Sequence, residues 1–336
     1  MVRFAIFGAG AWGTALAIHL ARAGQVVTLV PRREEQAALM RSQRQNEARL
    51  PGFSLPDNLH VDADSDQALA NSDVVFLGCP SVGLKDLCHS LSVSPALRVG
   101  GHGHVLISLA KGLEQKTLDV PSRVVQAALP YSDFGILSGP SFASEIAAGK
   151  PAALVLAMHG PSELIEDIQC ALSNAAMRIY LSDDILGVEL GGCLKNIYAI
   201  SAGICASLDL GSNATSALLT RALNEMVTLS VAMGADLRTL YGLAGFGDLM
   251  ATCSDDQSRN RTFGKRIGRG ESAEAILASQ GSVVEGYRAC DCFYQLCQKR
   301  GLVAPILNQI YAVLFECKPA RQALTDLMTR SLKAEH

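Results

Sequence analysis

The feature that most constrains the fold is a glycine pattern at the start of the chain. Gly8, Gly10 and Gly13 belong to the sequence GAGAWG, which follows the apolar run VRFAIF and opens the helical pattern TALAIHLARAG. In a strand–loop–helix unit, the first glycine permits the tight turn, the second admits a diphosphate, and the third lets the helix pack on the strand. The N–H groups of the helix N-terminus then face the diphosphate. The pattern predicts a dinucleotide-binding fold, and the alternative is an ordinary glycine-rich turn.

Short apolar runs alternate with helical patterns through the first half of the chain. Helical periodicity is present at Ala11–Ala23 and Glu34–Arg44. Strands that are almost continuously apolar and alternate with helices predict a parallel, doubly wound sheet of the Rossmann type, an α/β fold. The expected strands are Val2–Phe7, Val26–Val30, Val74–Gly78, Val105–Leu109, Phe134–Leu137, Ala152–Ala157 and Met177–Leu181.

Beyond Asp183 and Asp184 the strand signal fades and only helical patterns remain. We therefore expect a dinucleotide-binding domain at residues 1–183 and an all-helical substrate-binding and catalytic domain at residues 184–336. The expected helices of the second domain are Ile185–Ile204, Ala214–Met233, Arg261–Ile267, Cys290–Lys299 and Ile306–Glu316.

Composition excludes several classes of protein. A formal net charge of -3 and a pI near 6.2 argue against a nucleic-acid-binding protein. No apolar run is long enough to cross a bilayer, and no signal peptide is recognisable, so we expect no membrane insertion. The 10 cysteines lack the paired spacing of a zinc site, and His102 and His104 have no carboxylate or cysteine nearby, so no metal is expected. Scattered cysteines in apolar runs favour a reducing compartment, the cytoplasm.

The end of the second expected strand bears on the choice of nucleotide. NAD-binding folds usually place an acid there to hold the ribose 2′-hydroxyl. This chain has Arg32 and Arg33 instead, followed by Glu34. Because Arg32 can stack on adenine or pair with a 2′-phosphate, NADP(H) should be accepted. The alternative is a solvated helix start with two surface arginines.

Two further motifs follow expected strands at the edge of the sheet where ligands of open α/β folds bind. Lys111 lies in SLAKG, and Gly139 and Ser141 lie in SGPSFASE. The Gly-Pro pair makes a rigid turn, and Ser141 can offer a hydroxyl and an N–H to a polar ligand. Taken singly, each residue could be a surface lysine or a helix cap.

In the helical half, a carboxylate and a basic run suggest a site for a phosphorylated metabolite. Asp248 ends the glycine-rich stretch GLAGFGD, where its alternative role is a helix N-cap. Ser258, Arg259 and Asn260 open a helix that also carries Lys265. A capping serine, an arginine and helix N-terminal amides together form a good phosphate site.

Lys195 stands in the apolar run GGCLKNIYAI, where no acid of the run can pair with it. A helical side chain leans back over the residues three and four positions earlier, here Gly192 and Gly191. We therefore expect an empty notch in which a ligand lies against the amine, a setting in which desolvation tunes a lysine for proton transfer. The alternative is a lysine at the edge of a core helix that extends its amine to solvent.

Seven motifs in order, GAGAWGTALA, SLAKG, SGPSFASE, GGCLKN, GLAGFGDLMATC, SRNR and VVEGYR, closely resemble the NAD(P)-dependent glycerol-3-phosphate dehydrogenases of the bacterial type. The resemblance covers nearly the whole chain. It implies a cytoplasmic enzyme that reduces dihydroxyacetone phosphate to sn-glycerol 3-phosphate, the precursor of glycerophospholipids, with NADPH or NADH and without a metal.

The resemblance also assigns roles to positions. Lys195 matches the catalytic lysine, which Asp248 is expected to orient, and Ala11 stands where the family often has serine. The positions that match substrate contacts are Lys111, Gly139, Ser141, Lys195, Asp248, Ser258, Arg259 and Asn260. The expected cofactor contacts are Gly8, Gly10, Ala11, Trp12, Gly13, Arg32, Lys111, Ala143, Arg259, Val283 and Glu285.

Two alternative functions remain open from the sequence. One is a dehydrogenase of the same two-domain plan that acts on a 3-hydroxy acid or a sugar acid, and the other is an NADP(H)-sensing protein without turnover. A phosphate site at Ser258–Asn260 favours glycerol-3-phosphate dehydrogenase over the first, and a carboxylate-binding site there would favour the other dehydrogenase. A buried pair of Lys195 and Asp248 that faces the nicotinamide would argue against the sensing protein, and an exposed Lys195 far from it would support that protein. We also expect a homodimer, a state that the sequence itself does not specify.

Overall fold

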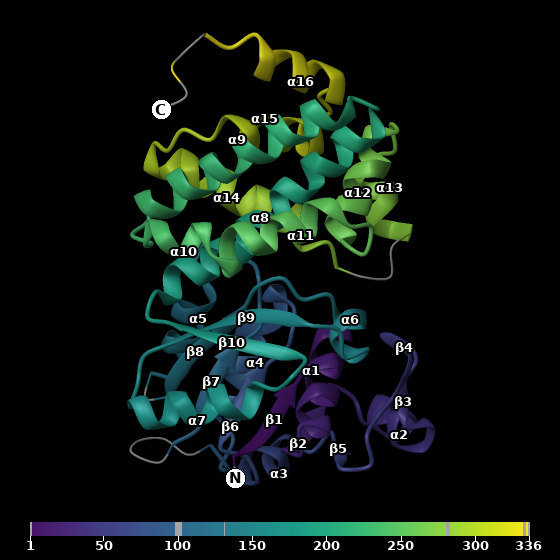
Figure 1. Cartoon of the computed structure of the whole chain (residues 1–336), viewed down its shortest axis with the longest axis vertical. Coiled ribbons are helices and arrows are strands. Elements are labelled where there is room, and N and C mark those ends of the chain that lie inside the picture. The colour runs from purple at the N-terminus through teal and green to yellow at the C-terminus, as the bar shows by residue number, and fades with distance from the viewer. Residues whose placement is uncertain (1, 98–102, 131, 280–282, 332–333, 335–336) are drawn as a thin grey trace. The chain divides into compact units, whose positions relative to one another are not determined.

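The computed structural model describes residues 2–97, 103–130, 132–279, 283–331 and 334. The chain divides into two compact units, which are coloured from purple to teal and from teal to yellow in Figure 1. Unit 1 comprises residues 1–114 and 119–189, and unit 2 comprises residues 115–118 and 190–336. In the histidine pair of the sequence, His102 lies outside the described residues. His104 is buried, and its ring lies 2.8 Å from the carbonyl oxygen of Leu69.

Unit 1 is built on an eight-stranded sheet in the order β10-β9-β8-β7-β6-β1-β2-β5. All seven expected strands are present, with ends that differ by no more than one residue from those predicted. The strands are β1 (Arg3–Phe7), β2 (Val26–Val30), β5 (Leu59–Val61), β6 (Val74–Leu77), β7 (Val105–Ser108), β8 (Asp133–Ser138), β9 (Ala152–Met158) and β10 (Met177–Ser182). A separate two-stranded sheet, which the sequence did not predict, pairs β3 (Gln45–Asn46) with β4 (Leu50–Ser54).

The predicted parallel sheet has one antiparallel pairing, in which β9 runs opposite to β8. The connection between them contains only α6 (Ala143–Ala147). Because β9 is antiparallel to β8, it starts at the end of the sheet where β8 finishes.

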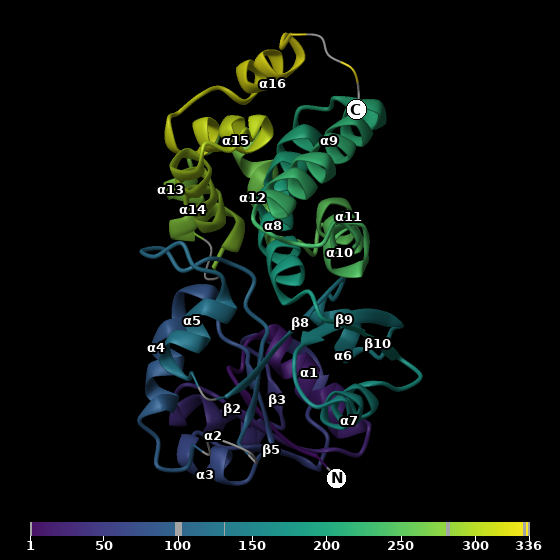
Figure 2. The ribbon, with the colours of Figure 1, turned by 90° about the vertical axis from the view of Figure 1, so that its left-hand side faces the viewer.

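Helices cover both faces of the sheet, with α1 and α7 on one side and α4 and α5 on the other (Figure 2). Alternate residues of β1 serve the two faces: Phe4 and Ile6 belong to one apolar cluster and Ala5 and Phe7 to the other. The helices of unit 1 are α1 (Ala11–Arg22), α2 (Glu34–Gln43), α3 (Ser65–Ala70), α4 (Ser81–Ser92), α5 (Pro121–Ala128), α6 and α7 (Ser162–Leu172).

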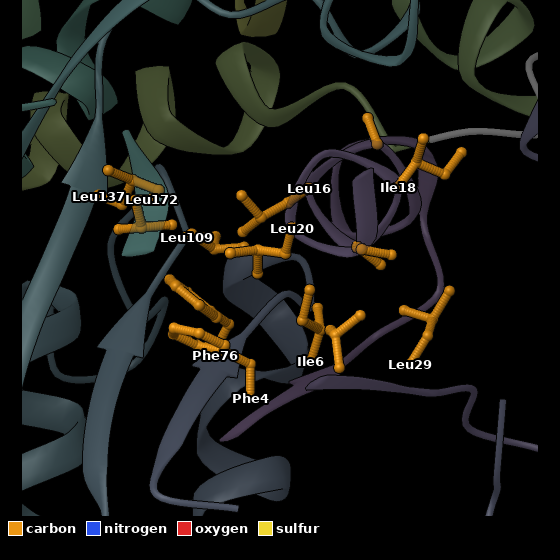
Figure 3. Packing of buried hydrophobic residues seen from close by; sticks show 14 of the residues in the cluster. Phe4, Ile6, Leu16, Ile18, Leu20, Leu29, Phe76, Leu109, Leu137 and Leu172 are labelled. Atoms are coloured by element: carbon orange, nitrogen blue, oxygen red, sulfur yellow. The ribbon is translucent and has the colours of Figure 1, made fainter. Parts of the chain in front are cut away.

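The larger cluster places α1 against the sheet. Figure 3 shows Leu16 and Leu20 of α1 directed toward Phe76 and Leu109. Each fully buried side chain of this size contributes about 1.5–3 kcal/mol to folding. The position of α1, and therefore of the glycine loop before it, is fixed by this packing.

The regular secondary structure in the described residues of unit 2 consists of helices, as the sequence predicted. All five expected helices are present, and the shorter elements between them were not predicted. The elements are α8 (Ile185–Ser207), which begins in unit 1, α9 (Gly211–Ala232), α10 (Leu237–Tyr241), the π-helix η1 (Leu243–Gly247), α11 (Asp248–Ser254), α12 (Arg259–Gly268), α13 (Ala273–Ser279), α14 (Glu285–Arg300), α15 (Pro305–Phe315) and α16 (Ala320–Met328). None of the helices in the described ranges is both long and apolar enough to cross a membrane.

Two contacts hold the helices around α8. A Cβ on Gly264 of α12 would lie 2.0 Å from the carbonyl oxygen of Ile200, so only glycine permits α12 to approach α8 this closely. The buried carboxylate of Glu225 accepts hydrogen bonds from the hydroxyl of Tyr198 (3.2 Å) and from the backbone N–H of Ile306 (2.7 Å) and Leu307 (2.9 Å). Glu225 thereby ties α9 to α8 and to the first turn of α15, while burial raises the pKa of its carboxyl group.

Candidate functional site

The glycine loop has the geometry that the sequence pattern predicted. Gly8 has a φ of +122°, and a Cβ there would lie 2.5 Å from the carbonyl oxygen of Gly78. A Cβ on Gly13 would lie 2.1 Å from the carbonyl oxygen of Gly8. Gly10 is the N-cap of α1 without a capping side chain, and open space lies where its side chain would be. Since the first turn of α1 contains no acid, the loop fits the diphosphate of a dinucleotide.

Arg32 lies two residues beyond β2, the strand whose Val30 accepts a hydrogen bond from Gly8 N–H (2.9 Å). Its side chain is exposed. The nearest following acid, Glu34, forms an ion pair with Arg41 of the same helix. The arginine therefore stands at the position where an NAD-specific fold would carry an acid.

The structure brings Lys111, Gly139 and Ser141 together at the carboxyl ends of β7 and β8. The Lys111 amine donates to the carbonyl oxygen of Gly139 (3.3 Å), and so does the Ser141 hydroxyl (2.9 Å). Gly139 has a φ of +132°, and a Cβ there would lie 3.0 Å from the side chain of Leu154. A cation and a hydroxyl thus converge on one carbonyl at the edge of the sheet that carries the glycine loop.

In unit 2, Lys195 and Asp248 form a buried ion pair, with side chains that are 9% and 1% exposed. The Lys195 amine also donates to the hydroxyl of Thr252 (3.0 Å), which in turn donates to the backbone carbonyl of Asp248 (2.6 Å). Sequence analysis missed Thr252. Its signal was its spacing, four residues after Asp248 and therefore on the same face of α11.

Asp248 is the first residue of α11, and its carboxylate pairs with Lys195 rather than capping that helix. The alternative interpretation of Lys195 as an edge lysine directed to solvent is wrong for the same reason. A charge in so apolar a place is tolerated only because the opposite charge accompanies it.

The expected empty notch before Lys195 is not present at Gly191. A Cβ on Gly191 would lie 2.6 Å from the carbonyl oxygen of Ala244, so the backbone of η1 occupies this space. Gly245 is similarly constrained, because its Cβ would lie 2.1 Å from the carbonyl oxygen of Leu240. These glycines serve backbone packing: Gly191 allows η1 to lie against α8, and Gly245 allows η1 to lie against α10. The π-helix η1 leads directly into Asp248.

Cys253 lies beside the ion pair on α11. Burial raises the pKa of its thiol to about 12, although the charge of Lys195 acts in the opposite direction. The thiol therefore stays protonated at physiological pH.

The N-terminus of α12 carries the residues expected to hold a phosphate. Ser258 is its N-cap, and its hydroxyl accepts from the N–H of Arg261 (3.2 Å). Arg261 and Lys265 both pair with Asp256, so part of the basic run is neutralised. Arg259 is exposed, and among the described residues its guanidinium has no carboxylate partner.

Asn260 is held in a network that connects three helices. Its side-chain amide donates to the side-chain oxygen of Asn196 (2.8 Å), and its oxygen accepts from the N–H of Gly286 (2.9 Å). Asn196 was not singled out by sequence analysis, although it follows Lys195 directly. The network fixes the start of α12 relative to α8 and α14.

The remaining expected cofactor contacts share one feature, a position at or just before the start of a helix. The structure places Ala11 and Trp12 at the start of α1, Ala143 at the start of α6, and Val283 and Glu285 at the start of α14. Helix N-termini favour negatively charged groups, which both a dinucleotide and a phosphorylated substrate carry. In the part of the chain that the structure describes, no cluster of three metal-ligating side chains is present.

Comparison with known proteins gives consistent matches over both units. Residues 3–164 match the family model described as the NAD-dependent glycerol-3-phosphate dehydrogenase N-terminus, and residues 184–325 match the model of its C-terminus. A glycerol-3-phosphate dehydrogenase [NAD(P)+] from Halorhodospira halophila is 42% identical over 98% of each chain. One from Geobacter sp. is 42% identical over 99% of this chain and 98% of its own. The crystal structure of glycerol-3-phosphate dehydrogenase from Coxiella burnetii superposes with a TM-score of 0.92, at 36% identity, over 98% of this chain and 99% of that one.

Proposed function

Since the chain belongs to the family of NAD-dependent glycerol-3-phosphate dehydrogenases, we propose that it reduces dihydroxyacetone phosphate reversibly to sn-glycerol 3-phosphate. The enzyme is an NAD(P)-dependent oxidoreductase, and its substrate is a small phosphorylated molecule. The product supplies the backbone of glycerophospholipids.

The buried cluster of Lys195, Asp248 and Thr252 carries the proposal. When bound, the reduced nicotinamide supplies a hydride to the C2 carbonyl carbon of the substrate. Lys195 supplies a proton to the oxygen at C2, which would otherwise become an alkoxide, and takes this proton back in the reverse reaction. Asp248 and Thr252 hold the amine in place, since they bond it from one face of α11.

The other site residues are proposed to bind and orient the two ligands. The backbone of Gly8–Gly13 and the side chain of Arg32 hold NADP(H) or NAD(H), together with Ala143, Val283 and Glu285. Ser258, Arg259 and Asn260 hold the phosphate of the substrate, which positions its reacting carbon. Lys111, Gly139 and Ser141 contact the substrate from the carboxyl ends of β7 and β8, and Lys111 and Arg259 also contact the cofactor.

We assign cofactor binding to residues 1–183 and substrate binding and catalysis to residues 184–336. We further propose a cytoplasmic homodimer. The cytoplasm is supported by the 10 free cysteines, seven of them buried, which suit a reducing compartment. Size-exclusion chromatography with light scattering tests the dimer, and a fluorescent fusion expressed in the source cell tests the compartment.

The test of function is the consumption of NADPH or NADH by the purified protein with dihydroxyacetone phosphate. We expect turnover with this substrate and little with unphosphorylated dihydroxyacetone, which cannot use the start of α12. Activity on a 3-hydroxy acid or a sugar acid, without activity on dihydroxyacetone phosphate, would support the alternative dehydrogenase. Cofactor binding without turnover of any of these would support the sensing protein, which the buried Lys195–Asp248 pair disfavours.

A further inference from the structure

A buried asparagine outside the expected site forms hydrogen bonds to the glycine loop. The side-chain amide of Asn46 donates to the carbonyl oxygen of Ala9 (2.9 Å) and to the hydroxyl of Thr14 (2.7 Å). Asn46 is 2% exposed and lies on β3. Gln36 of α2 donates to the same carbonyl of Ala9, at 3.3 Å. Two side chains from two elements therefore hold one peptide group of the loop.

The orientation of this peptide decides where the next N–H points. In a planar trans peptide, the C=O of one residue and the N–H of the next point in opposite directions. Fixing the Ala9 carbonyl toward Asn46 therefore directs the Gly10 N–H away from Asn46. Without such a restraint, Gly10 on one side of the peptide lowers the cost of rotating it, and Gly8 precedes Ala9 on the other side. The loop then would not present its N–H groups to an anion in one fixed arrangement.

Asn46 can act as a restraint because the hairpin that carries it is itself anchored. The guanidinium of Arg44, two residues earlier, donates to the carbonyl oxygens of Leu55 (3.2 Å) and Leu59 (3.3 Å) and to that of Pro56. Leu50 of β4 and Leu55 are buried in the apolar cluster that fixes α1. Both ends of the Asn46–Ala9 contact are thus attached to the same core.

We propose that Asn46, supported by Gln36, is a positioning residue that presets the glycine loop for the diphosphate of NAD(P)(H). This inference rests on the proposed function, because it concerns the cofactor of that reaction. Asn46 itself touches neither cofactor nor substrate. It acts through Ala9 and Gly10, so its removal should weaken cofactor binding and leave the chemical step unchanged.

The test is the dissociation constant of NADPH, measured without substrate by the fluorescence of Trp12, the single tryptophan of the chain. Asn46→Ala should raise this constant about tenfold, since a buried carbonyl loses a main partner. Gln36→Ala, on a partly exposed helix, should raise it only about twofold, because its bond is longer. In the double variant the dissociation constant should rise by more than the product of the two single factors, since the carbonyl of Ala9 then has no side-chain donor. With saturating NADPH, kcat and the KM for dihydroxyacetone phosphate should stay near those of the parent.

Asn58→Ala is the matched control. Asn58 donates to the carbonyl oxygen of Ala21 (2.8 Å) at the other end of α1, so its loss affects the same helix but not the loop. We expect a lower Tm and an unchanged dissociation constant. The proposal is overturned if folded Asn46→Ala binds NADPH like the parent, if the control weakens binding equally, or, should Asn46→Ala not fold, if Gln36→Ala has no effect. A parent that binds NADPH but does not reduce dihydroxyacetone phosphate would instead refute the proposed function alone.

Discussion

At the scale of single residues, the pairing of Lys195 with Asp248 means that a substitution of Lys195 should change both turnover and stability. Lys195→Met should lower turnover by about 10²–10⁴, the usual effect of losing a general acid–base group. It should also lower the Tm, because the carboxylate of Asp248, 1% exposed, loses its cation. Activity assays and thermal unfolding of the same preparation check both effects.

The double variant Lys195→Met with Asp248→Asn separates the two effects. Since no charge remains unpaired, its Tm should recover toward that of the parent, while turnover stays low. A fully active Lys195→Met protein would refute the assignment of Lys195 as the acid–base group.

Arg32 should affect the use of NADPH and not that of NADH. We expect the parent to use NADPH at least as well as NADH, because an arginine attracts the 2′-phosphate that an acid would repel. Arg32→Asp should raise the KM for NADPH selectively. Steady-state kinetics with both cofactors measure this, and equal losses with the two would show that Arg32 does not contact the 2′-phosphate.

Arg259 should affect substrate binding through the phosphate. Arg259→Ala should raise the KM for dihydroxyacetone phosphate roughly 10- to 100-fold, the effect of one charge-assisted hydrogen bond. The weak reaction of unphosphorylated dihydroxyacetone should hardly change. If activity falls by the same factor with both substrates, Arg259 acts in cofactor binding or in folding instead.

At the scale of elements, Glu189 of α8 connects the start of that helix to α5. Its carboxylate accepts from the backbone N–H (2.6 Å) and the hydroxyl (2.7 Å) of Ser122, in the first turn of α5. Burial raises the pKa of Glu189 from 4.5 to about 7, against the opposing effects of Ser122 and the charge of Arg123. The folded protein therefore keeps a proton that the unfolded chain releases between these values.

This raised pKa predicts the sign of a pH effect. The contribution of Glu189 to stability is fully present below about pH 4.5 and is lost as the pH rises through about 7. The Tm of the parent minus that of Glu189→Gln should thus fall over this range. Thermal unfolding at several pH values provides the measurement, and a constant difference for Glu189→Gln would contradict the assigned pKa.

Most elements were predictable because their residues carry the signal locally. The apolar run of β1, the glycines after it and the periodicity of α1 all lie within residues 2–23. The antiparallel direction of β9 could not be predicted in this way, because the 13 residues between β8 and β9 (139–151) are about as many as the shortest crossover needs. The β3–β4 hairpin could not, because its strands are short and partly polar and depend on Arg44 for anchoring.

The residues of the candidate site also divide into those that the sequence could predict and those that it could not. Lys195, Asp248 and Ser258 could be singled out because a buried charge or a capping position is unusual in its local sequence. Thr252 had only its spacing from Asp248 as a signal, and a threonine inside a helix is ordinary until Lys195 is known to bond it. Gly191 was misinterpreted because a missing side chain marks either ligand space or close backbone approach, and only the position of Ala244 distinguishes the two.

At the scale of the whole molecule, β10 bears on how copies of the chain associate. It is an outer strand of the sheet, and three of its backbone groups are bonded by side chains. Asn174 accepts from the N–H of Met177 (3.0 Å), Ser173 accepts from the N–H of Ile179 (3.3 Å), and Gln169 donates to the carbonyl of Ile179 (2.8 Å). Such blocking prevents strand pairing between molecules.

Removing these side chains should therefore promote association. Gln169→Ala combined with Ser173→Ala should give a concentration-dependent increase in light scattering, because the edge at Ile179 becomes free to pair. Gln295→Ala, which removes an exposed glutamine bonded to Asp291 on α14, is the control and should scatter like the parent. Unchanged scattering of the double variant would show that the edge is protected by other means.

The contact between Glu189 and Ser122 also limits how the gene can be divided. A split protein cut after residue 183, where the strands end, would leave Ser122 on one fragment and its carboxylate partner on the other. The first turn of α5 would then lose two hydrogen bonds in the nucleotide-binding fragment. In fragment complementation or domain exchange with a relative, residues 184–189 should therefore stay with the first fragment. The reassembled enzyme then takes Ser122 and its hydrogen-bond acceptor, Glu189, from the same parent.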